Sequence, residues 1–121
     1  MPKPVLYHNP RCSKSRSAYE LLETRGVDVD VVKYLDTAPD RADLERIVDG
    51  LRSPPAALVR KDARFKELGL TASDYVTRDS VVAVLSDHPE LMERPVVVVG
   101  DRAVIGRPPE RVLELVDEES S

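Results

Sequence analysis

The sequence predicts an α/β fold in which a βαβ half and a ββα half are separated by a helical insertion at about residues 40–90. Three observations lead to this prediction. Strand, helix and strand patterns follow one another at the start, helical patterns fill the middle, and an apolar hairpin followed by a helix closes the chain. Residues 1–121 are expected to form one domain, because this length suits a single hydrophobic core.

The first half begins with a short apolar strand at residues 5–7. Apolar residues at helical spacing then predict a helix from residue 13 to about 24, and Gly26 follows as a stop signal. Valines alternate with charged residues over 27–34, which is a strand pattern. A βαβ unit of this kind places its two strands parallel to each other.

The insertion begins with two helical patterns. Asp40 is suited to cap the first, which runs through Asp49 with its apolar residues on one face. A proline pair opens the second, a short helix over residues 56–60. Residues 61–69 are expected to be a charged connection.

The last helix of the insertion is predicted to begin at Asp79, because Asp79 and Ser80 are good N-cap residues, and to end before Pro89. Residues 71–74 resemble the cap of one short turn. The β-branched residues of this helix also suit a strand, but the capping residues favour the helix.

The second half returns to β-structure. An apolar run at 96–99, a tight turn at 100–101 and a second run at 103–106 predict a β-hairpin. The proline pair at 108–109 starts a last helix. Its buried stripe is expected to contain Val112, Leu113 and Val116.

Composition excludes several functional classes. The net charge of -4 argues against general nucleic-acid binding, and 4% aromatic residues leave no stacking platform for bases. One cysteine and two histidines make a metal site unexpected. No stretch approaches the ~20 apolar residues that cross a bilayer, and no apolar signal segment stands at the N-terminus. We therefore expect no membrane partner and a cytoplasmic protein, and we expect a monomer.

Cys12, the only cysteine, lies where the first strand ends and the first helix begins. A thiol there faces the positive end of the helix dipole and unpaired backbone N–H groups, and both favour the thiolate. Arg11, Lys14 and Arg16 add positive charge nearby. The alternative is a small buried hydrophobic residue, which rarely lies in a loop of Pro, Ser, Lys and Arg. The pattern favours a reactive thiolate.

The order of elements, with a thiol at the first strand-to-helix turn, is the thioredoxin-like arrangement with a helical insertion. That fold carries a cis-proline close to the thiol, just before its third strand. Pro95 stands at the corresponding place. An ordinary trans peptide bond is the alternative, but the position favours cis.

Three arginines are expected near the thiol loop. Arg94 and Arg107 lie at turns next to the third and fourth strands, and an insertion can place Arg60 opposite them. Converging guanidinium groups suit a tetrahedral oxyanion, because each donates two parallel hydrogen bonds and keeps its charge. Three separate solvated surface arginines are the alternative.

The chain resembles a known family, the ArsC-type arsenate reductases that draw electrons from glutathione and glutaredoxin. The resemblance runs from the first strand to the last helix. It rests on residues 7–10 with Cys12, Ser15 and Arg16, on Tyr34, Leu35 and Pro39, on 58–61, 67–70 and 88–89, and on 94–97 and 107–108.

The resemblance implies an oxidoreductase in which Cys12 attacks arsenate while Arg60, Arg94 and Arg107 bind its oxygens. Glutathione or another low-molecular-weight thiol then acts as co-substrate and displaces the arsenic-bound oxygen. A glutaredoxin-like protein removes the resulting mixed disulfide, and arsenite is released. No bound cofactor is implied.

Two further residues gain roles from the resemblance. His8 resembles the family's histidine beside the thiol and is expected to help hold the thiolate; a polar residue at a strand end is the alternative. Ser15 lies one helical turn after Cys12 and is expected to donate its hydroxyl to the sulfur.

Two other functions stay open. Ser13 and Lys14 follow the cysteine, where family members that reduce arsenate often carry small residues, so a thiol-dependent reductase of another substrate is one alternative. The other is a non-enzymatic thiol-stress regulator that binds a protein partner through the same fold. That regulator senses oxidants with a Cys-x-x-Cys pair, whereas Ser15 replaces the second cysteine here. The arginines favour the enzyme, because a regulator needs no set of anion ligands.

Overall fold

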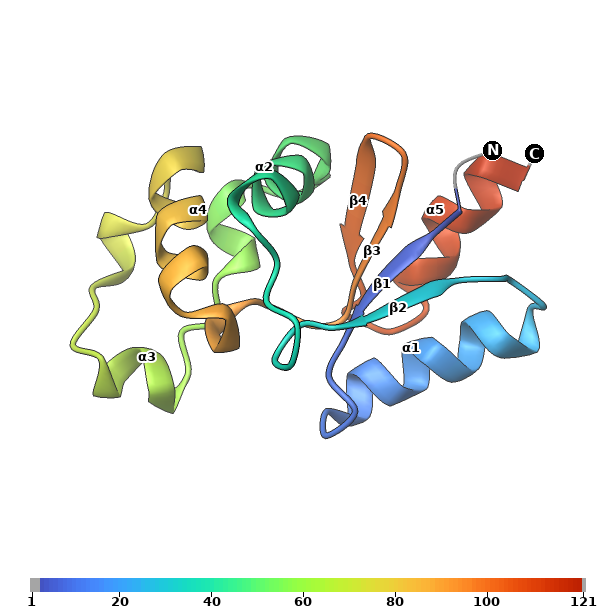
Figure 1. The fold of residues 1–121 in the computed structure, drawn as a ribbon, viewed down its shortest axis with the longest axis horizontal. Helices are drawn as coiled ribbons and strands as arrows, with labels where there is room; N and C mark the ends of the chain where they lie inside the picture. The colour runs from blue at the N-terminus through green and yellow to red at the C-terminus, as the bar shows by residue number, and fades with distance from the viewer. Residues whose placement is uncertain (1–2, 121) are drawn as a thin grey trace.

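A computed structural model describes residues 3–120 and contains a four-stranded sheet in the order β2–β1–β3–β4 (Figure 1). The strands are Val5–His8 (β1), Asp30–Lys33 (β2), Val96–Val99 (β3) and Arg102–Ile105 (β4). As predicted, β1 and β2 run parallel, and β3 and β4 form an antiparallel hairpin. β3 also pairs antiparallel with β1. The chain has the predicted thioredoxin-like α/β fold.

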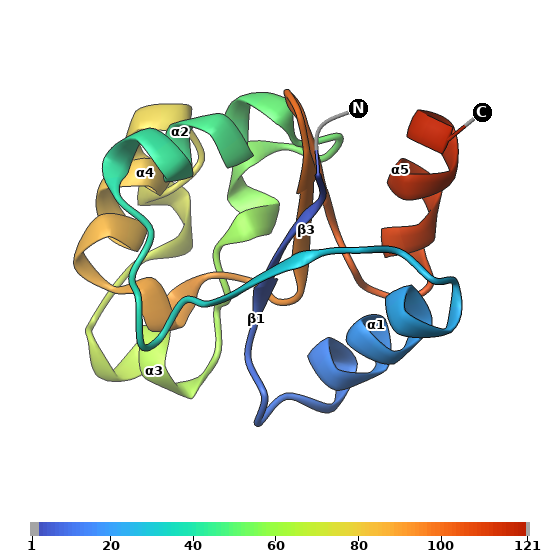
Figure 2. The ribbon, with the colours of Figure 1, turned by 45° about the vertical axis from the view of Figure 1, so that its right-hand side comes forward.

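Helices cover both faces of the sheet (Figures 1 and 2). The α-helices are Ser13–Thr24 (α1), Arg41–Gly50 (α2), Ala63–Glu67 (α3), Arg78–Asp87 (α4) and Arg111–Ser120 (α5), with 3-10 turns at Pro55–Leu58, Ala72–Asp74 and Pro89–Leu91. α1 and α5 pack on one face, and the helices of the insertion pack on the other. Within residues 3–120, no helix is long and apolar enough to cross a membrane.

The sheet separates two hydrophobic cores. Side chains alternate between the faces of a strand, so Leu6 packs with α1 and α5 whereas its neighbour Tyr7 packs with the insertion. The four valines of β3 divide in the same way and are all buried. Burial on both faces explains why β3 is a continuous apolar run rather than an alternating one.

Strand β2 is shorter than the alternating pattern over 27–34 predicts. The backbone N–H of Val27 donates to the carbonyl of Leu22 at 3.0 Å, so Val27 still belongs to the turn that ends α1. β1 offers paired positions only to the residues from Asp30 to Lys33. The pairing partner, rather than the sequence pattern, sets the length of this edge strand.

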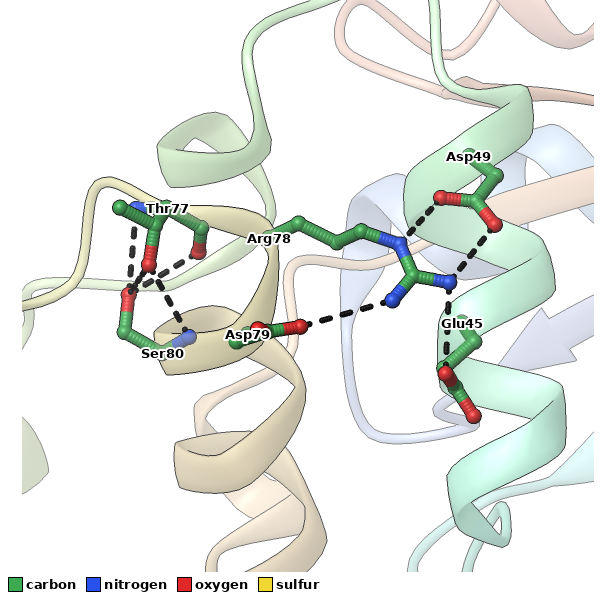
Figure 3. Close-up of polar contacts among 6 residues, drawn as sticks. All are labelled: Glu45, Asp49, Thr77, Arg78, Asp79 and Ser80. Atoms are coloured by element: carbon green, nitrogen blue, oxygen red, sulfur yellow. Dashed lines mark hydrogen bonds and ion pairs between the residues drawn. The ribbon is translucent and has the colours of Figure 1, made fainter.

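Helix α4 forms as a helix, as its capping residues predict, but it begins one residue early. Its N-cap is Thr77 rather than Asp79. The Thr77 hydroxyl accepts from the backbone N–H of Ser80 at 3.2 Å, and the Ser80 hydroxyl accepts from the Thr77 N–H at 3.1 Å (Figure 3). This reciprocal pair is a capping box, which places Asp79 inside the first turn.

The connection at 61–69 contains a helix that the sequence analysis missed. Asp62 caps α3 by accepting the backbone N–H of Phe65 at 3.3 Å, and Phe65 is buried in the core of the insertion. A single buried side chain in a charged segment gives too little periodicity to reveal so short a helix.

The last helix starts later than predicted. The proline pair precedes it, and α5 begins at Arg111. Its buried residues are Val112, Leu115 and Val116, whereas Leu113 is only partly buried. Spacings of three and four residues keep this stripe on the face toward the sheet.

One arginine joins two helices of the insertion. Arg78 of α4 donates from Nε to Asp49 Oδ1 at 2.6 Å and from Nη2 to Asp49 Oδ2 at 2.9 Å (Figure 3). Its Nη2 also lies 3.3 Å from Glu45 Oε2. Both acids are on α2, so the guanidinium links α4 to α2 at the surface.

Candidate active site

Cys12 is the N-cap residue of α1, and the loop before it has a defined shape. The extended backbone of Cys12 donates its N–H to the carbonyl of Asn9 at 3.0 Å. The Asn9 side chain accepts the backbone N–H of Arg11 at 2.9 Å. These bonds hold the half-buried sulfur at the N-terminal end of the helix, where the backbone N–H groups have no partners within the helix.

The surroundings of the sulfur favour its ionised form. Burial alone would raise the pKa of Cys12. The Ser15 N–H, the Arg94 guanidinium and the Lys14 N–H lie near the sulfur and favour the thiolate more than burial opposes it, so the pKa of the thiol is lowered. A thiolate is the nucleophilic form of cysteine, so the lowered pKa raises the fraction of Cys12 that can attack an electrophile at a given pH.

Arg107 approaches the sulfur from the other end of the chain. Its Nη2 lies 3.7 Å from Cys12 Sγ, and its Nε donates to the backbone carbonyl of Arg94 at 2.9 Å. A Cβ atom on Gly106 would lie 2.8 Å from the Pro95 ring. The small residue before Arg107 therefore lets this segment pass close to Pro95.

Two of the three candidate arginines, Arg94 and Arg107, precede a cis-proline. The Arg94–Pro95 peptide bond is cis, as its position before β3 predicts. The Arg107–Pro108 bond is also cis, which the sequence analysis did not predict. The backbone N–H of Gly106 donates to the Pro95 carbonyl at 2.8 Å, so the two segments lie side by side next to the thiol loop.

Arg60 reaches this region through the insertion. An isolated antiparallel bridge joins Val59 to Met92, which draws the segment of Arg60 against the segment before Arg94. Arg60 Nε lies 3.2 Å from Asp62 Oδ2 and its Nη1 lies 3.5 Å from Glu93 Oε1. Arg60 is thus connected to Arg107 through the Glu93 carboxylate.

His8 and Ser15 bind each other. His8 is buried at the end of β1, and its Nδ1 lies 2.7 Å from Ser15 Oγ. Burial, together with the charges of Lys33 and Arg16, lowers the pKa of His8, so the ring is neutral at neutral pH. A neutral ring supplies no positive charge to a thiolate.

The bonds of Ser15 differ from the expectation. Its hydroxyl accepts the backbone N–H of Asn9 at 3.0 Å in addition to its contact with His8. Within the described residues, the Ser15 hydroxyl contacts His8 and Asn9, and the Ser15 group that favours the Cys12 thiolate is the backbone N–H. The side chain is fully buried and ties the start of α1 to the end of β1.

Two residues near the site received no role from the sequence. Tyr34 is fully buried, and its hydroxyl faces Arg94 and Asn9 without a hydrogen bond of ordinary geometry to any described residue. Glu93 places its carboxylate beside Arg60 and Arg107. In the sequence, only the position of Glu93 directly before Arg94 indicated a role at this site.

The described part of the chain holds no group of three or more His, Cys, Asp or Glu side chains that could bind a metal ion. Asp62 and Glu93 are paired with arginines. What the arrangement offers is a thiolate surrounded by hydrogen-bond donors, which suits nucleophilic chemistry on an anionic substrate.

Matches to known proteins extend over nearly the whole chain. A model of the ArsC family matches residues 7–115. A Neisseria meningitidis serogroup A protein named "Arsenate reductase" is 46% identical over 114 residues, which cover 93% of this chain and 97% of that protein. The Escherichia coli protein named "Uncharacterized protein YfgD" is 44% identical over 92% of this chain and 94% of its own. The structure titled "Arsenate reductase from Vibrio cholerae" matches with a TM-score of 0.82 at 43% identity, over 93% and 97% of the two chains.

Proposed function

This chain belongs to the ArsC family, and on that premise we propose that it is an arsenate reductase that converts arsenate to arsenite. The observation that carries the proposal is the environment of Cys12. Its sulfur has a lowered pKa and lies 3.7 Å from an Arg107 nitrogen. An activated thiolate beside fixed positive charge is what attack on an oxyanion requires.

In the proposed reaction, Cys12 attacks the arsenic and one oxygen leaves as water. An external thiol then supplies a second sulfur, because the chain contains no other cysteine. Arsenic gains two electrons, and the two thiols lose their protons to become one mixed disulfide. A dithiol protein of the glutaredoxin kind restores Cys12 by thiol–disulfide exchange.

We assign the substrate oxygens to Arg94, Arg107 and Arg60. Arg94 is supported by its lowering of the pKa of Cys12 and by a buried Nε that has no partner among the described residues. Arg107 is supported by its distance to the sulfur. Because the thiol needs a reducing compartment, the cytoplasm is the proposed location, and a monomer is the proposed state.

A thiol-dependent reductase of another substrate is the second candidate. It is favoured by the pairing of Arg60 with Asp62 and Glu93, which leaves this arginine less available for a substrate anion. The arsenate proposal therefore depends most on Arg94 and Arg107.

Coupled turnover with purified components tests the proposal. The reduced protein alone should not turn over arsenate repeatedly. Addition of glutathione should give one adduct per chain on Cys12, visible by mass spectrometry, and a glutaredoxin should clear it and sustain arsenite release. Sustained turnover without an external thiol, or an obligatory disulfide-linked dimer, would contradict the scheme.

A further inference from the structure

A carboxylate lies between two of the arginines assigned to the oxyanion. Glu93 Oε1 is 3.3 Å from Arg107 Nε and 3.5 Å from Arg60 Nη1, and the Glu93 side chain is only 22% exposed. We propose that Glu93 is a positioning and specificity-determining residue, which orients both guanidinium groups and makes the site favour singly over doubly charged oxyanions. This inference rests on the oxyanion site of the proposed function.

The backbone fixes Glu93 in this place. Its N–H donates to the carbonyl of Leu58 at 2.7 Å, and the Arg60 N–H donates to the carbonyl of Leu91 at 2.7 Å. These two bonds flank the bridge between the segments and set Arg60 and Glu93 side by side. The carboxylate therefore meets Arg60 through local pairing rather than through a flexible surface contact.

Glu93 also acts on the arginine nearest the thiol. Arg107 Nε contacts both the Glu93 carboxylate and the Arg94 carbonyl, while its Nη2 lies at the Cys12 sulfur. With Nε held on one side, the planar guanidinium presents its remaining N–H groups in a fixed direction. Loss of the carboxylate should therefore disorder the donors of Arg107.

The carboxylate changes the charge that an incoming anion meets. Arg60, Arg94 and Arg107 carry three positive charges, and the carboxylates of Glu93 and Asp62 offset two of them. The Cys12 thiolate offsets the third. The repulsion energy from Glu93 is twice as large for a doubly charged anion as for a singly charged one, because Coulomb energy scales with charge.

Two tetrahedral anions that do not titrate near neutral pH separate these effects. Sulfate carries two charges and perchlorate carries one, and titration calorimetry on the reduced full chain measures the affinity of each. Glu93→Gln keeps an acceptor oxygen and removes the charge. It should tighten sulfate binding about tenfold and perchlorate binding about threefold. Glu93→Ala also removes the acceptor, so it should bind both anions more weakly than Glu93→Gln.

Glu90→Gln is the matched control. Glu90 lies on the neighbouring 3-10 turn and pairs with Arg64 at 2.9 Å, outside the cluster around Cys12. The same chemical change there should leave both affinities and their ratio unchanged. Thermal unfolding of each variant checks that the fold is retained.

The outcomes distinguish the inference from the function on which it rests. Equal effects of Glu93→Gln on sulfate and perchlorate, or equal affinities of the Gln and Ala variants, would overturn the role of Glu93. The predicted affinities in a protein that fails to reduce arsenate would support the role and remove only the arsenate assignment. Failure of both anions to bind the unaltered chain would overturn the oxyanion site and this inference with it.

Discussion

The arginine that joins α4 to α2 and Arg94 of the Cys12 site present the same side chain in opposite surroundings. Arg78 is 42% exposed, and its nitrogens face the carboxylates of Asp49, Glu45 and Asp79 (Figure 3). Arg94 is part-buried, and its buried Nε has no partner among the described residues.

The difference separates a structural contact from a binding site. An exposed guanidinium surrounded by acids joins two helices and contributes little to stability. A buried donor without a partner destabilises the fold, and a bound oxyanion would supply the missing acceptor. The unpaired Nε of Arg94 therefore suits the proposed oxyanion site, whereas Arg78 is already paired with carboxylates.

The largest expected effect on activity comes from substitution of Cys12. Cys12→Ser should abolish reductase activity and leave the fold intact, because a hydroxyl is hardly ionised near neutral pH and is a far weaker nucleophile. Arsenite formation in the coupled assay measures the activity, and circular dichroism checks the fold. Arsenate reduction by this variant would remove the central role of Cys12.

A paired substitution tests the comparison directly. Arg94→Ala should lower kcat/KM by about tenfold or more, since a charge-assisted hydrogen bond contributes roughly 1.5–3 kcal/mol. Arg78→Ala should leave kcat/KM unchanged, because its carboxylate partners lie on α2 and α4 outside the Cys12 site. Similar losses in both variants would show that the two clusters do not differ in the way proposed.

The pH dependence of Cys12 reactivity tests whether the groups around its sulfur favour the thiolate. Because its pKa is lowered, alkylation by iodoacetamide should reach its half-maximal rate below the free-thiol value of about 8.5. Arg94→Ala should move that midpoint upward, because it removes a positively charged donor group that favours the thiolate.

The same shift affects stability with a definite sign. The folded state binds this proton less tightly than the unfolded chain does. The thiolate therefore contributes stability that is present above the unfolded pKa and is lost as the pH falls through the lowered folded pKa. Denaturant unfolding of Cys12→Ser should lack this pH-dependent part, and identical profiles for both proteins would contradict the lowered pKa.

A smaller effect is expected at the surface cluster. Arg78→Ala should lower the Tm modestly, and the difference from the unaltered protein should shrink as salt is added, because screening weakens exposed ion pairs. Calorimetric scans at low and high ionic strength measure both quantities. A decrease in Tm that salt does not reduce would indicate that Arg78 stabilises the fold through side-chain packing rather than through its charge.

The smallest effect is expected at Tyr34. Its buried hydroxyl has no hydrogen bond of ordinary geometry among the described residues. Tyr34→Phe should therefore leave the free energy of unfolding unchanged or raise it by up to ~1 kcal/mol. Urea unfolding provides the measurement. A clear destabilisation would show that the Tyr34 hydroxyl makes a stabilising hydrogen bond in solution.

Local signals in the sequence determined the elements whose ends are marked by capping residues or by apolar spacing. The bounds of α1 follow from its apolar spacing, and the start of α2 follows from Asp40, which caps it. The place of Cys12 at the end of β1, and the cis bond before Pro95, were predictable because each depends on the order of elements along the chain.

Tertiary structure decided what depends on contacts between distant segments. The capping box of α4 and the pairing of β2 set bounds that hydrophobic patterns left loose. Arg60 meets Glu93 across 33 positions, and Arg107 meets Cys12 across 95. Charges so far apart in sequence carry no periodicity that relates them. Only the packing of the insertion against the sheet determines which carboxylate lies between which arginines.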